Sequence, residues 1–358
     1  MRVAMISRAT LFSSPGGDTR QIEETAKRLR VLGVEAEIVT TRRTIDYGRY
    51  DLLHFFNIIR PADMLRHVRR SKRPYVVSTI FVEYGAVDET CRGVGVGVLQ
   101  KLFSANALEY LKTIGRTMRN GERIVSPEFL WRGQAGSMAA ILRGARLLLP
   151  NSRSEGRRLA EKFAGLPPCR VIPNGVDAGA AAKSYPGSAA HRGAVLCMGR
   201  IETLKNQLAL IRALNGAPYR LYIHGRTAPN HRAYYMKCRS EAAPNVHIEG
   251  PLTDDALYAA YASAKVHVLP SYFETTGLSS LEASVMGCNV VVTDRGDTRE
   301  YFGDEAWYCE PDRPESIRAA VDAAYKAPFR ESLRTRILRD FTWTRAAEET
   351  FRAYKEAL

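Results

Sequence analysis

The sequence lacks several patterns that mark common classes of protein. No apolar run approaches the roughly 20 residues that a membrane-spanning helix needs, and the first residues, MRVAMISRATLF, do not form a signal peptide. The six cysteines are scattered, without a C-x-x-C pair or a histidine partner at zinc spacing. No D-x-D triplet, the usual metal clamp for a diphosphate, is present. We therefore expect a cytoplasmic protein with reduced thiols, no metal site and no cofactor.

Positive charge is unevenly distributed along the chain. The net charge of the 358 residues is +14, and residues 1–170 carry +13 of it. The densest basic segment is Arg60–Pro74, and a second lies around Lys112, Arg116, Arg119 and Arg123. Such asymmetry favours a polyanionic surface as partner of the N-terminal half.

The Arg60–Pro74 segment also has an apolar side, formed by Met64, Leu65 and Val68, as a helix in a membrane interface would have. We expect peripheral contact with anionic lipid on the inner face of the plasma membrane. A solvated helix face that serves solubility is the alternative. A nucleic-acid partner is not expected, because the patch lacks interleaved aromatic residues.

Strand patterns alternate with helix patterns along most of the chain. The first half predicts strands at Arg2–Ser7, Val34–Thr40, Tyr50–Phe56, Arg73–Phe81 and Ala145–Ser152, and helices at Thr19–Leu32, capped by Asp18, and at Ser154–Ala164. The second half predicts strands at Ala194–Arg200, Tyr219–Gly225, Asn245–Gly250, Val266–Pro270 and Asn289–Asp294. Alternating βα units imply parallel sheets with helices on both faces. The fold class is therefore α/β, with two Rossmann-like domains facing each other across a cleft.

The domain boundaries follow from composition. Ala178–Gly193 is small, polar and contains Pro and Gly, so it is a candidate interdomain linker. We expect an N-terminal domain over residues 1–177 and a C-terminal domain over residues 178–342. The end of the chain, Phe341–Leu358, has the pattern of an amphipathic helix.

Two carboxylates lie eight positions apart in Ser271–Asn289. Glu274 belongs to a loop, and Glu282 to a helix that begins after Gly277, with Ser279 and Ser280 as candidate caps. A helix N-terminus suits a phosphate, and carboxylates beside it accept hydrogen bonds from sugar hydroxyls. This combination indicates a sugar nucleotide, with phosphates on backbone amides, the hexose near Glu274 and the ribose near Glu282.

Two cations follow the strand that begins at Ala194. Arg200 lies where this strand reaches the carboxyl edge of its sheet, and Lys205 is five residues further on. A nucleoside diphosphate gains negative charge as it leaves, and two fixed cations can neutralise that charge without a proton donor.

Four ordered segments resemble one known family. They are LLPNSRSEGRRL, VIPNGVD, GRIETLKNQLALIRAL and PSYFETTGLSSLEASVMGCNVVVTD. Together they are similar to the retaining glycosyltransferases of GT-B fold, specifically glycosyltransferase family 4. The resemblance is good over about residues 147–345 and loose before them.

The resemblance implies roles for individual residues. Arg200 and Lys205 would clasp the donor diphosphate, Glu274 would hold hydroxyls of the hexose, and Glu282 would hold the ribose. The backbone of Thr276, Gly277 and Leu278 would lie beside sugar and phosphate. Gly16 and Gly17 would approach the donor phosphate and acceptor, and Gly225, with the Glu249–Leu252 segment, would frame the base. The helix at residues 343–358 would pack back on the N-terminal domain.

Two features depart from the family pattern. Thr275 and Thr276 follow Glu274 where relatives usually have Gly-Phe, which puts the identity of the hexose in question. The chain also has no histidine shortly after Arg73–Phe81, where many relatives have one. Glu83 is the candidate that accepts or orients the incoming hydroxyl proton, with His54 as a second candidate.

The resulting hypothesis is a metal-independent retaining hexosyltransferase. It would move a hexosyl group from a UDP- or GDP-sugar to a hydroxyl of a glycan or lipid-linked acceptor, in polysaccharide or lipopolysaccharide biosynthesis. A sugar-nucleotide 2-epimerase, which shares the fold, is the alternative from another enzyme class. A basic nucleic-acid binder is the non-catalytic alternative.

Overall fold

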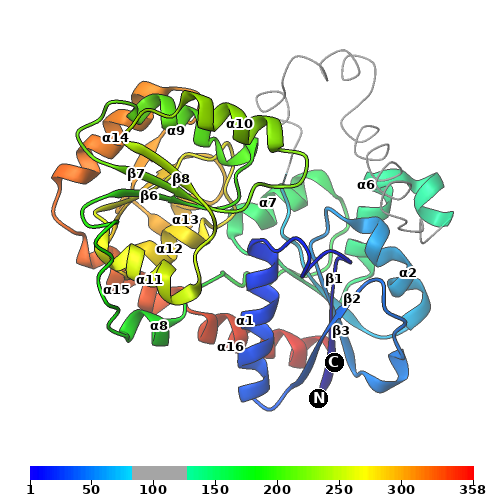
Figure 1. Ribbon diagram of the computed structural model, residues 1–358. Coiled ribbons are helices and arrows are strands. Elements are labelled where there is room, and N and C mark those ends of the chain that lie inside the picture. Colours follow the sequence, from blue (N-terminus) through cyan, green and yellow to red (C-terminus); the bar gives the residue numbers. More distant parts are fainter. Residues whose placement is uncertain (83–126) are drawn as a thin grey trace. The chain divides into compact units, whose positions relative to one another are not determined.

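The computed structural model describes residues 1–82 and 127–358, which form two parallel β-sheets with helices on their faces (Figure 1). In spatial order, the first sheet consists of β2 (Glu35–Thr40), β1 (Arg2–Ser7), β3 (Leu52–Phe56), β4 (Tyr75–Ser78) and β5 (Leu147–Leu149). The second consists of β11 (Trp307–Cys309), β10 (Asn289–Thr293), β9 (Val266–Leu269), β6 (Val195–Met198), β7 (Leu221–His224) and β8 (Val246–Glu249). The α/β class and the two Rossmann-like sheets predicted from the sequence are confirmed.

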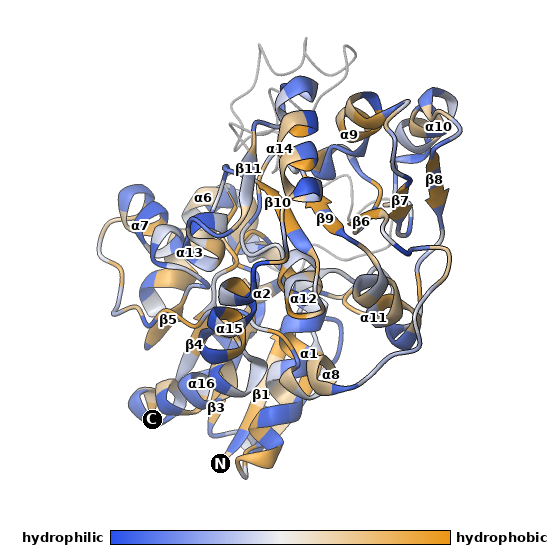
Figure 2. Cartoon of the chain, turned by 90° about the vertical axis from the view of Figure 1, so that its left-hand side faces the viewer, coloured by the Kyte–Doolittle hydropathy of each residue, from blue (hydrophilic) through white to orange (hydrophobic). Residues whose placement is uncertain are grey.

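Burial explains why these segments form parallel strands. All residues of β9 and β10 are buried, and β1 is buried except at its first residue and half-buried there. Near-continuous apolar runs are typical of parallel strands covered on both faces. Figure 2 shows the hydrophobic colouring concentrated on strands such as β9 and β10.

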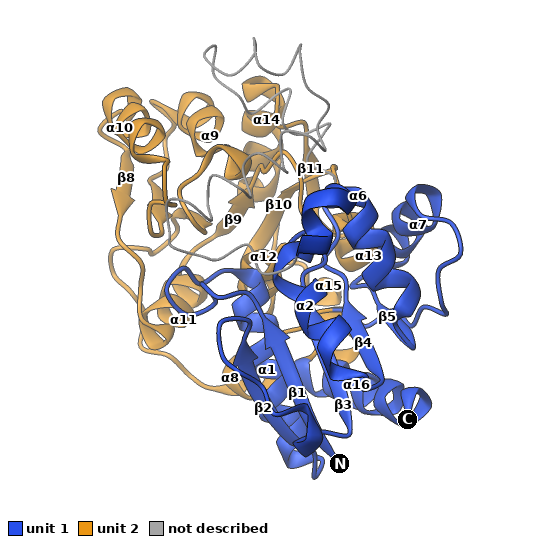
Figure 3. Ribbon diagram, turned by 90° about the vertical axis from the view of Figure 1, so that its right-hand side faces the viewer, with its two compact units in different colours: residues 1–173, 343–358 blue, residues 174–342 orange. Residues whose placement is uncertain are grey.

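The chain divides into two compact units, which Figure 3 shows in different colours. Unit 1 contains residues 1–173 and 343–358, with α1 (Gly17–Val31), α2 (Pro61–Ser71), α6 (Pro127–Gly144), α7 (Arg153–Lys162) and α16 (Trp343–Ala357). Unit 2 contains residues 174–342, with α8 (Ala178–Ala182), α9 (Gln207–Leu214), α10 (Arg232–Glu241), α11 (Asp254–Ser263), α12 (Leu278–Val285), α13 (Thr298–Phe302), α14 (Pro314–Lys326) and α15 (Glu331–Asp340).

The last helix, α16, packs against α1 in the first unit. Its Tyr354 is fully buried, and the Tyr354 hydroxyl hydrogen-bonds to Nδ1 of His54 in β3 at 2.7 Å. Arg170 forms a second tie, with Glu356 of the same helix at 2.7 Å. The final helix is therefore an integral part of the first unit.

The segment Ala178–Gly193, expected to be a linker, lies within the second unit instead. It begins with α8 and then attaches to neighbouring elements, because the Ser188 backbone N–H donates to Ser263 Oγ at 2.7 Å. His191 hydrogen-bonds to His224 through their Nε2 atoms at 2.9 Å. A small and polar composition indicated a linker, but it did not reveal these specific bonds.

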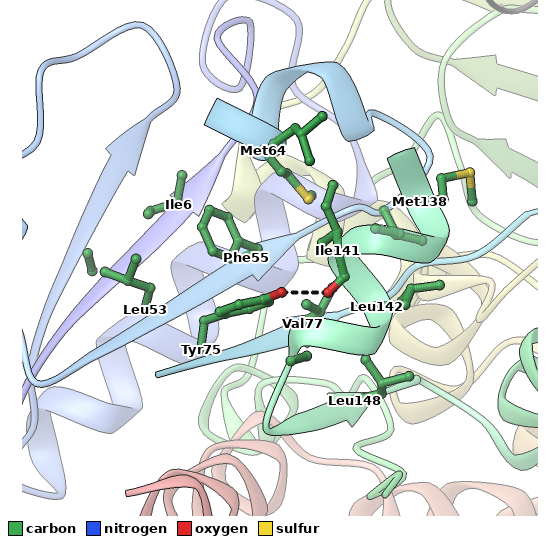
Figure 4. Close-up of a cluster of buried hydrophobic side chains, with 14 of the residues drawn as sticks. Ile6, Leu53, Phe55, Met64, Tyr75, Val77, Met138, Ile141, Leu142 and Leu148 are labelled. Carbon is green, nitrogen blue, oxygen red and sulfur yellow. Dashed lines mark hydrogen bonds between the residues drawn. The ribbon is translucent and has the colours of Figure 1, made fainter. Parts of the chain in front are cut away.

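The apolar side of α2 faces the core of its own unit. The prediction that Met64, Leu65 and Val68 face a membrane interface is therefore wrong. Met64 and Leu65 are 2% and 1% exposed, and Val68 packs against the same cluster. Figure 4 shows Met64 near Ile141 of α6, in the cluster where the Tyr75 hydroxyl donates to the Ile141 carbonyl at 2.7 Å. Burial of these residues against α6 takes up the surface that lipid would have covered.

The start of α1 also differs from expectation. The helix begins at Gly17 with Gly16 as N-cap, so Asp18 lies inside the first turn and does not cap it. Its carboxylate pairs with the buried Arg8 guanidinium, at 2.6 Å from Arg8 Nε. Burial alone would raise the pKa of Asp18, but the hydrogen bonds and charge of Arg8 lower it below its ordinary value. Pairing with the buried charge of Arg8 thus takes precedence over capping.

Candidate functional site

The order of strands in the second sheet selects one place on its carboxyl edge. The chain runs from β6 through β7 to β8 on one side and returns through β9, β10 and β11 on the other. In open parallel sheets, ligands bind beyond the carboxyl ends of strands where this order reverses. Here that place lies beyond β6 and β9. Two loops meet there, and we call residues 199–206 the cation loop and residues 270–277 the glutamate loop.

The cation loop is attached to its neighbours by Asn206, which is 4% exposed and has a left-handed backbone with φ 56°. The Asn206 side-chain amide donates to the carbonyls of Pro270 at 3.1 Å and Pro311 at 2.7 Å. In addition, the Tyr272 backbone N–H donates to the Leu204 carbonyl at 2.9 Å. These bonds bring the two loops together at the edge of the sheet.

The structure brings Lys205 and Glu274 into direct contact. Lys205 Nζ lies 2.5 Å from Glu274 Oε1, and the buried Ser271 hydroxyl donates to the same oxygen at 2.5 Å. The Lys205 side chain is 20% exposed and that of Glu274 is 7% exposed. A cation and a carboxylate, separated by 69 positions in the sequence, thus form one polar centre.

Arg200 lies in the same loop but has a different partner. Its Nη2 lies 2.9 Å from Oε1 of Glu202, and the Arg200 side chain is 41% exposed whereas that of Glu202 is 9% exposed. Gln207 holds the backbone here, because its Nε2 donates to the Arg200 carbonyl at 2.8 Å. The Arg200 guanidinium is therefore partly accessible to solvent, while the buried Glu202 carboxylate holds it through Nη2.

The backbone of Glu274 is paired with the chain that follows β10. Glu274 forms an isolated parallel bridge with Gly296, and the Asp297 N–H donates to the Glu274 carbonyl at 2.8 Å. At Gly296, φ is 99°, and a Cβ atom would lie 2.1 Å from the Glu274 carbonyl oxygen. Only glycine fits this close approach.

The start of α12 differs from the expected serine cap. Its N-cap is Gly277, with φ 74°, and no side chain caps the helix. Ser280 is fully buried, and its hydroxyl hydrogen-bonds to Nδ1 of His267 at 3.2 Å. The expectation was wrong because Ser280 already belongs to the first turn and faces β9. Leu278, the first helical residue, is partly buried against the core.

Thr276 is buried and turned toward the interior of the unit. It is 2% exposed, and its hydroxyl accepts a hydrogen bond from Asn174 Nδ2 at 3.0 Å. Glu282 lies further along α12 and is half-buried. Burial raises the pKa of the nearby Tyr261 hydroxyl, and the charge of Glu282 raises it further.

Gly225 contacts the cation loop directly. A Cβ atom at Gly225 would lie 1.7 Å from the Gly199 carbonyl oxygen, and the Gly199 N–H donates to the His224 carbonyl at 3.0 Å. Glycine is thus required for the backbone after β7 to lie beside the residue that precedes Arg200. This packing is a physical reason for Gly225 that the sequence did not show.

The remaining predicted residues lie in the first unit or outside the described part. Gly16 is the N-cap of α1 and Gly17 its first residue, and the Gly16 N–H donates to Thr19 Oγ1 at 3.0 Å. Glu83 lies outside the described residues, as do Lys112, Arg116, Arg119 and Arg123.

His54 is not placed to receive a proton from an incoming hydroxyl. It is 1% exposed and hydrogen-bonded to Tyr354 and, through Nε2, to Ser78 Oγ at 2.9 Å. Burial lowers its pKa to about 3. His54 is therefore a packed, neutral histidine.

Three positioning residues were missed by sequence reasoning: Asn206, Ser271 and Gly296. Ser271 and Gly296 follow strands β9 and β10 directly or closely, and a systematic search of residues after each strand would have selected them. Asn206 carries no comparable signal, because its role depends on carbonyls 64 and 105 positions away.

Among residues 1–82 and 127–358, no cluster of three or more His, Cys, Asp or Glu side chains could hold a metal ion. Over the same residues, no helix is both long enough and apolar enough to cross a membrane.

Comparisons with known proteins relate the chain to glycosyltransferases. Residues 186–338 match the family described as Glycosyl transferases group 1, and this range contains both loops. The matched range lies within the second unit, residues 174–342. One curated relative is O-antigen chain mannosyltransferase B of Escherichia coli, which is 28% identical to this chain over 46% of this chain and 46% of the relative. D-inositol 3-phosphate glycosyltransferase of Acidothermus cellulolyticus is 26% identical over 62% of this chain and 55% of the relative. The chain thus spans about half the length of these two relatives.

Solved structures extend the fold likeness over the whole chain. Sucrose-phosphate synthase from Thermosynechococcus elongatus has a TM-score of 0.74 at 16% identity, covering 99% of this chain and 98% of that one. HepE from Anabaena, in complex with UDP and glucose, has a TM-score of 0.70 at 15% identity and covers 99% of each chain. The GT-B fold predicted from the sequence is confirmed.

Proposed function

We propose that the chain is a metal-independent retaining glycosyltransferase. It moves a hexosyl group from a UDP- or GDP-sugar to a hydroxyl of a glycan or lipid-linked acceptor. The observation that carries the proposal is the contact of Lys205 with Glu274 beyond β6 and β9, with Arg200 in the same loop as Lys205, inside the range that matches the group 1 family. HepE, whose fold is similar, was solved with UDP and glucose, which supports a nucleotide-sugar donor.

The two cations act on the leaving group. As the bond between the anomeric carbon and the phosphate oxygen breaks, negative charge grows on the nucleoside diphosphate. Arg200, with its accessible face, and Lys205 neutralise this charge, and they need no proton transfer to do so. Lys205 Nζ donates a hydrogen bond to Glu274 Oε1. A bound diphosphate therefore either interacts with Lys205 alongside Glu274 or replaces Glu274 as its partner.

Glu274 then binds the hexose. A carboxylate accepts hydrogen bonds from sugar hydroxyls, and Ser271 holds one of its oxygens in place. The start of α12 at Gly277 presents backbone N–H groups to the phosphate or sugar. Glu282, on the same helix, accepts hydrogen bonds from the ribose hydroxyls. Acceptor attack on the face that the diphosphate leaves, with that phosphate taking the acceptor proton, gives retention.

The acceptor is proposed to belong to cell-surface polysaccharide or lipopolysaccharide. The E. coli relative is an O-antigen chain mannosyltransferase, which supports this class of pathway. Arg69, Arg70, Lys72 and Arg73 are exposed at the end of α2 and after it, and they provide positive charge for peripheral contact with an anionic membrane.

A thermal-shift panel of UDP- and GDP-sugars tests the donor site. A ligand at 100 times its Kd adds about 2.7 kcal/mol to apparent stability. Lys205→Ala should abolish the shift, whereas Lys326→Ala, an exposed lysine of α14 in the same unit, should retain it. No shift with any member of the panel in the unsubstituted chain would remove the proposed function.

Two further measurements test the finer claims. NMR of the product should show the anomeric configuration of the donor, and an inverted centre would remove the retaining mechanism. Flotation with liposomes should show preference for anionic over neutral lipid, and equal binding would remove the membrane contact.

A further inference from the structure

Three buried residues of the second unit form a closed ring of hydrogen bonds. Asn174 Nδ2 donates to Thr276 Oγ1 at 3.0 Å, and the Asn174 backbone N–H donates to the Tyr301 hydroxyl oxygen at 3.2 Å. The Thr276 hydroxyl donates to the same Tyr301 oxygen at 3.4 Å, which closes the ring. The three residues are 5%, 2% and 1% exposed in the order Asn174, Thr276 and Tyr301. Buried bonds of this kind fix one conformation, since a lost partner leaves a polar group unsatisfied.

Asn174 is itself held in a rigid place. It is the first residue of the second unit, and Thr342 is the last. At the adjacent Gly175, a Cβ atom would lie 2.3 Å from the Thr342 carbonyl carbon, and the Val176 N–H donates to the Phe341 carbonyl at 2.9 Å. The segments by which the chain enters and leaves the unit are thus paired, and Asn174 extends from that pair to the glutamate loop.

Tyr301 approaches the ring from α13. The chain between β10 and α13 contains Gly296, which is bridged to Glu274. The glutamate loop is therefore held at Glu274 by backbone pairing and at Thr276 by the ring. These two attachments fix the peptides that lead into Gly277 and α12.

We propose that Asn174, Thr276 and Tyr301 are positioning residues for the sugar and diphosphate of the donor. The ring sets the position of the glutamate loop, and through it the Glu274 carboxylate and the first N–H groups of α12. This inference rests on the proposed function. The Thr276 side chain acts through the loop, because its hydroxyl is bonded to Asn174 and Tyr301 in the interior.

Thr276→Val is the direct test, because it keeps the shape and removes the hydroxyl. Affinity for the sugar nucleotide should fall about tenfold, which corresponds to one lost buried hydrogen bond. Affinity for the nucleoside monophosphate, which lacks the sugar and second phosphate, should change less than twofold. Thr276→Ser, which retains the hydroxyl, should restore most of the loss.

The measurement is isothermal titration well below the unfolding temperature. The probes are UDP-glucose with UMP and GDP-mannose with GMP, and the pair that binds the unsubstituted chain is used. Tyr301→Phe should likewise lower the affinity for the sugar nucleotide and leave the affinity for the nucleoside monophosphate nearly unchanged. Tyr325→Phe is its matched control, since that hydroxyl donates to the Gly193 carbonyl at 2.8 Å elsewhere in the unit. Thr350→Val, in α16, is the matched control for the threonine.

The outcomes separate this inference from the proposed function. If neither sugar nucleotide binds the unsubstituted chain, the proposed function fails. If one sugar nucleotide binds the unsubstituted chain, two results refute the positioning role. The first is that Thr276→Val binds that sugar nucleotide with equal affinity, and the second is that its affinities for the sugar nucleotide and for the nucleoside monophosphate fall by the same factor. Should Thr276→Val not fold, Tyr301→Phe and Thr276→Ser decide by the same selective loss and recovery.

Discussion

Gly225→Ala should displace the cation loop without touching any charged group. A Cβ atom at this position would lie 1.7 Å from the Gly199 carbonyl oxygen, and real Cβ atoms essentially never come closer than 3.0 Å. The two backbone segments must therefore separate by about 1.3 Å. The atom that is struck belongs to the backbone directly before Arg200, so no flexible side chain can move aside.

The expected magnitudes follow from this displacement. Overpacking of a buried contact costs about 1–3 kcal/mol in the free energy of unfolding. A shift of about 1 Å in a positioning element can reduce a reaction rate about 100-fold. We therefore expect Gly225→Ala to fold with a lower Tm, and to lose sugar-nucleotide binding and transfer far more than its stability loss explains.

Gly187→Ala is the matched control for this substitution. Gly187 is an exposed residue of the same unit, and a Cβ atom there would meet only Ser263 Oγ at 3.7 Å, an ordinary van der Waals contact. Thermal unfolding and titration with the sugar nucleotide should find this control close to the unsubstituted chain. Equal affinity of Gly225→Ala and Gly187→Ala for the donor would refute the claim that Gly225 positions the cation loop.

Two other predictions concern stability. His54 has a folded pKa of about 3, lowered by burial, so the unfolded chain binds more protons below its ordinary pKa near 6.5. The free energy of unfolding should therefore fall as pH decreases from about 6.5 toward 4, by up to about 1.4 kcal/mol per pH unit for this histidine. Urea titrations should show a shallower fall in His54→Asn, and an unchanged slope would contradict the assignment. Asn206→Ala removes two buried hydrogen bonds and a favoured left-handed residue, so it should cost about 2–3 kcal/mol. Asn206→Gly, which restores only the backbone freedom, should recover part of that cost, and equal Tm values for the two variants would argue against the backbone contribution.

The strands could be predicted because their physics is local. An almost wholly apolar run such as β10 indicates a parallel strand covered on both faces wherever it occurs. Charged residues shortly after a strand, such as Arg200 two positions after β6, then indicate the carboxyl edge. Topology adds that β6 and β9 are neighbours, which places Lys205 beside Glu274.

The errors arose where a residue serves a distant partner instead of its local pattern. Asp18 has the composition of a helix cap, but the buried Arg8 requires a counter-charge. Met64 and Leu65 have the spacing of a membrane-facing stripe, but α6 covers them. In each case the sequence showed the chemical character of the side chain correctly and left its partner undetermined.

The same distinction explains why the ring around Thr276 was not foreseen. The resemblance to the family implied a Gly-Phe pair where Thr275 and Thr276 stand, and that departure put the identity of the hexose in question. The structure turns the Thr276 hydroxyl toward Asn174, 102 positions earlier, and Tyr301, 25 positions later. A smaller, polar side chain is compatible with burial only because these two partners satisfy its hydroxyl. Thr276→Phe should therefore be disruptive, since it would leave Asn174 Nδ2 without its threonine acceptor and would add volume to a filled interior.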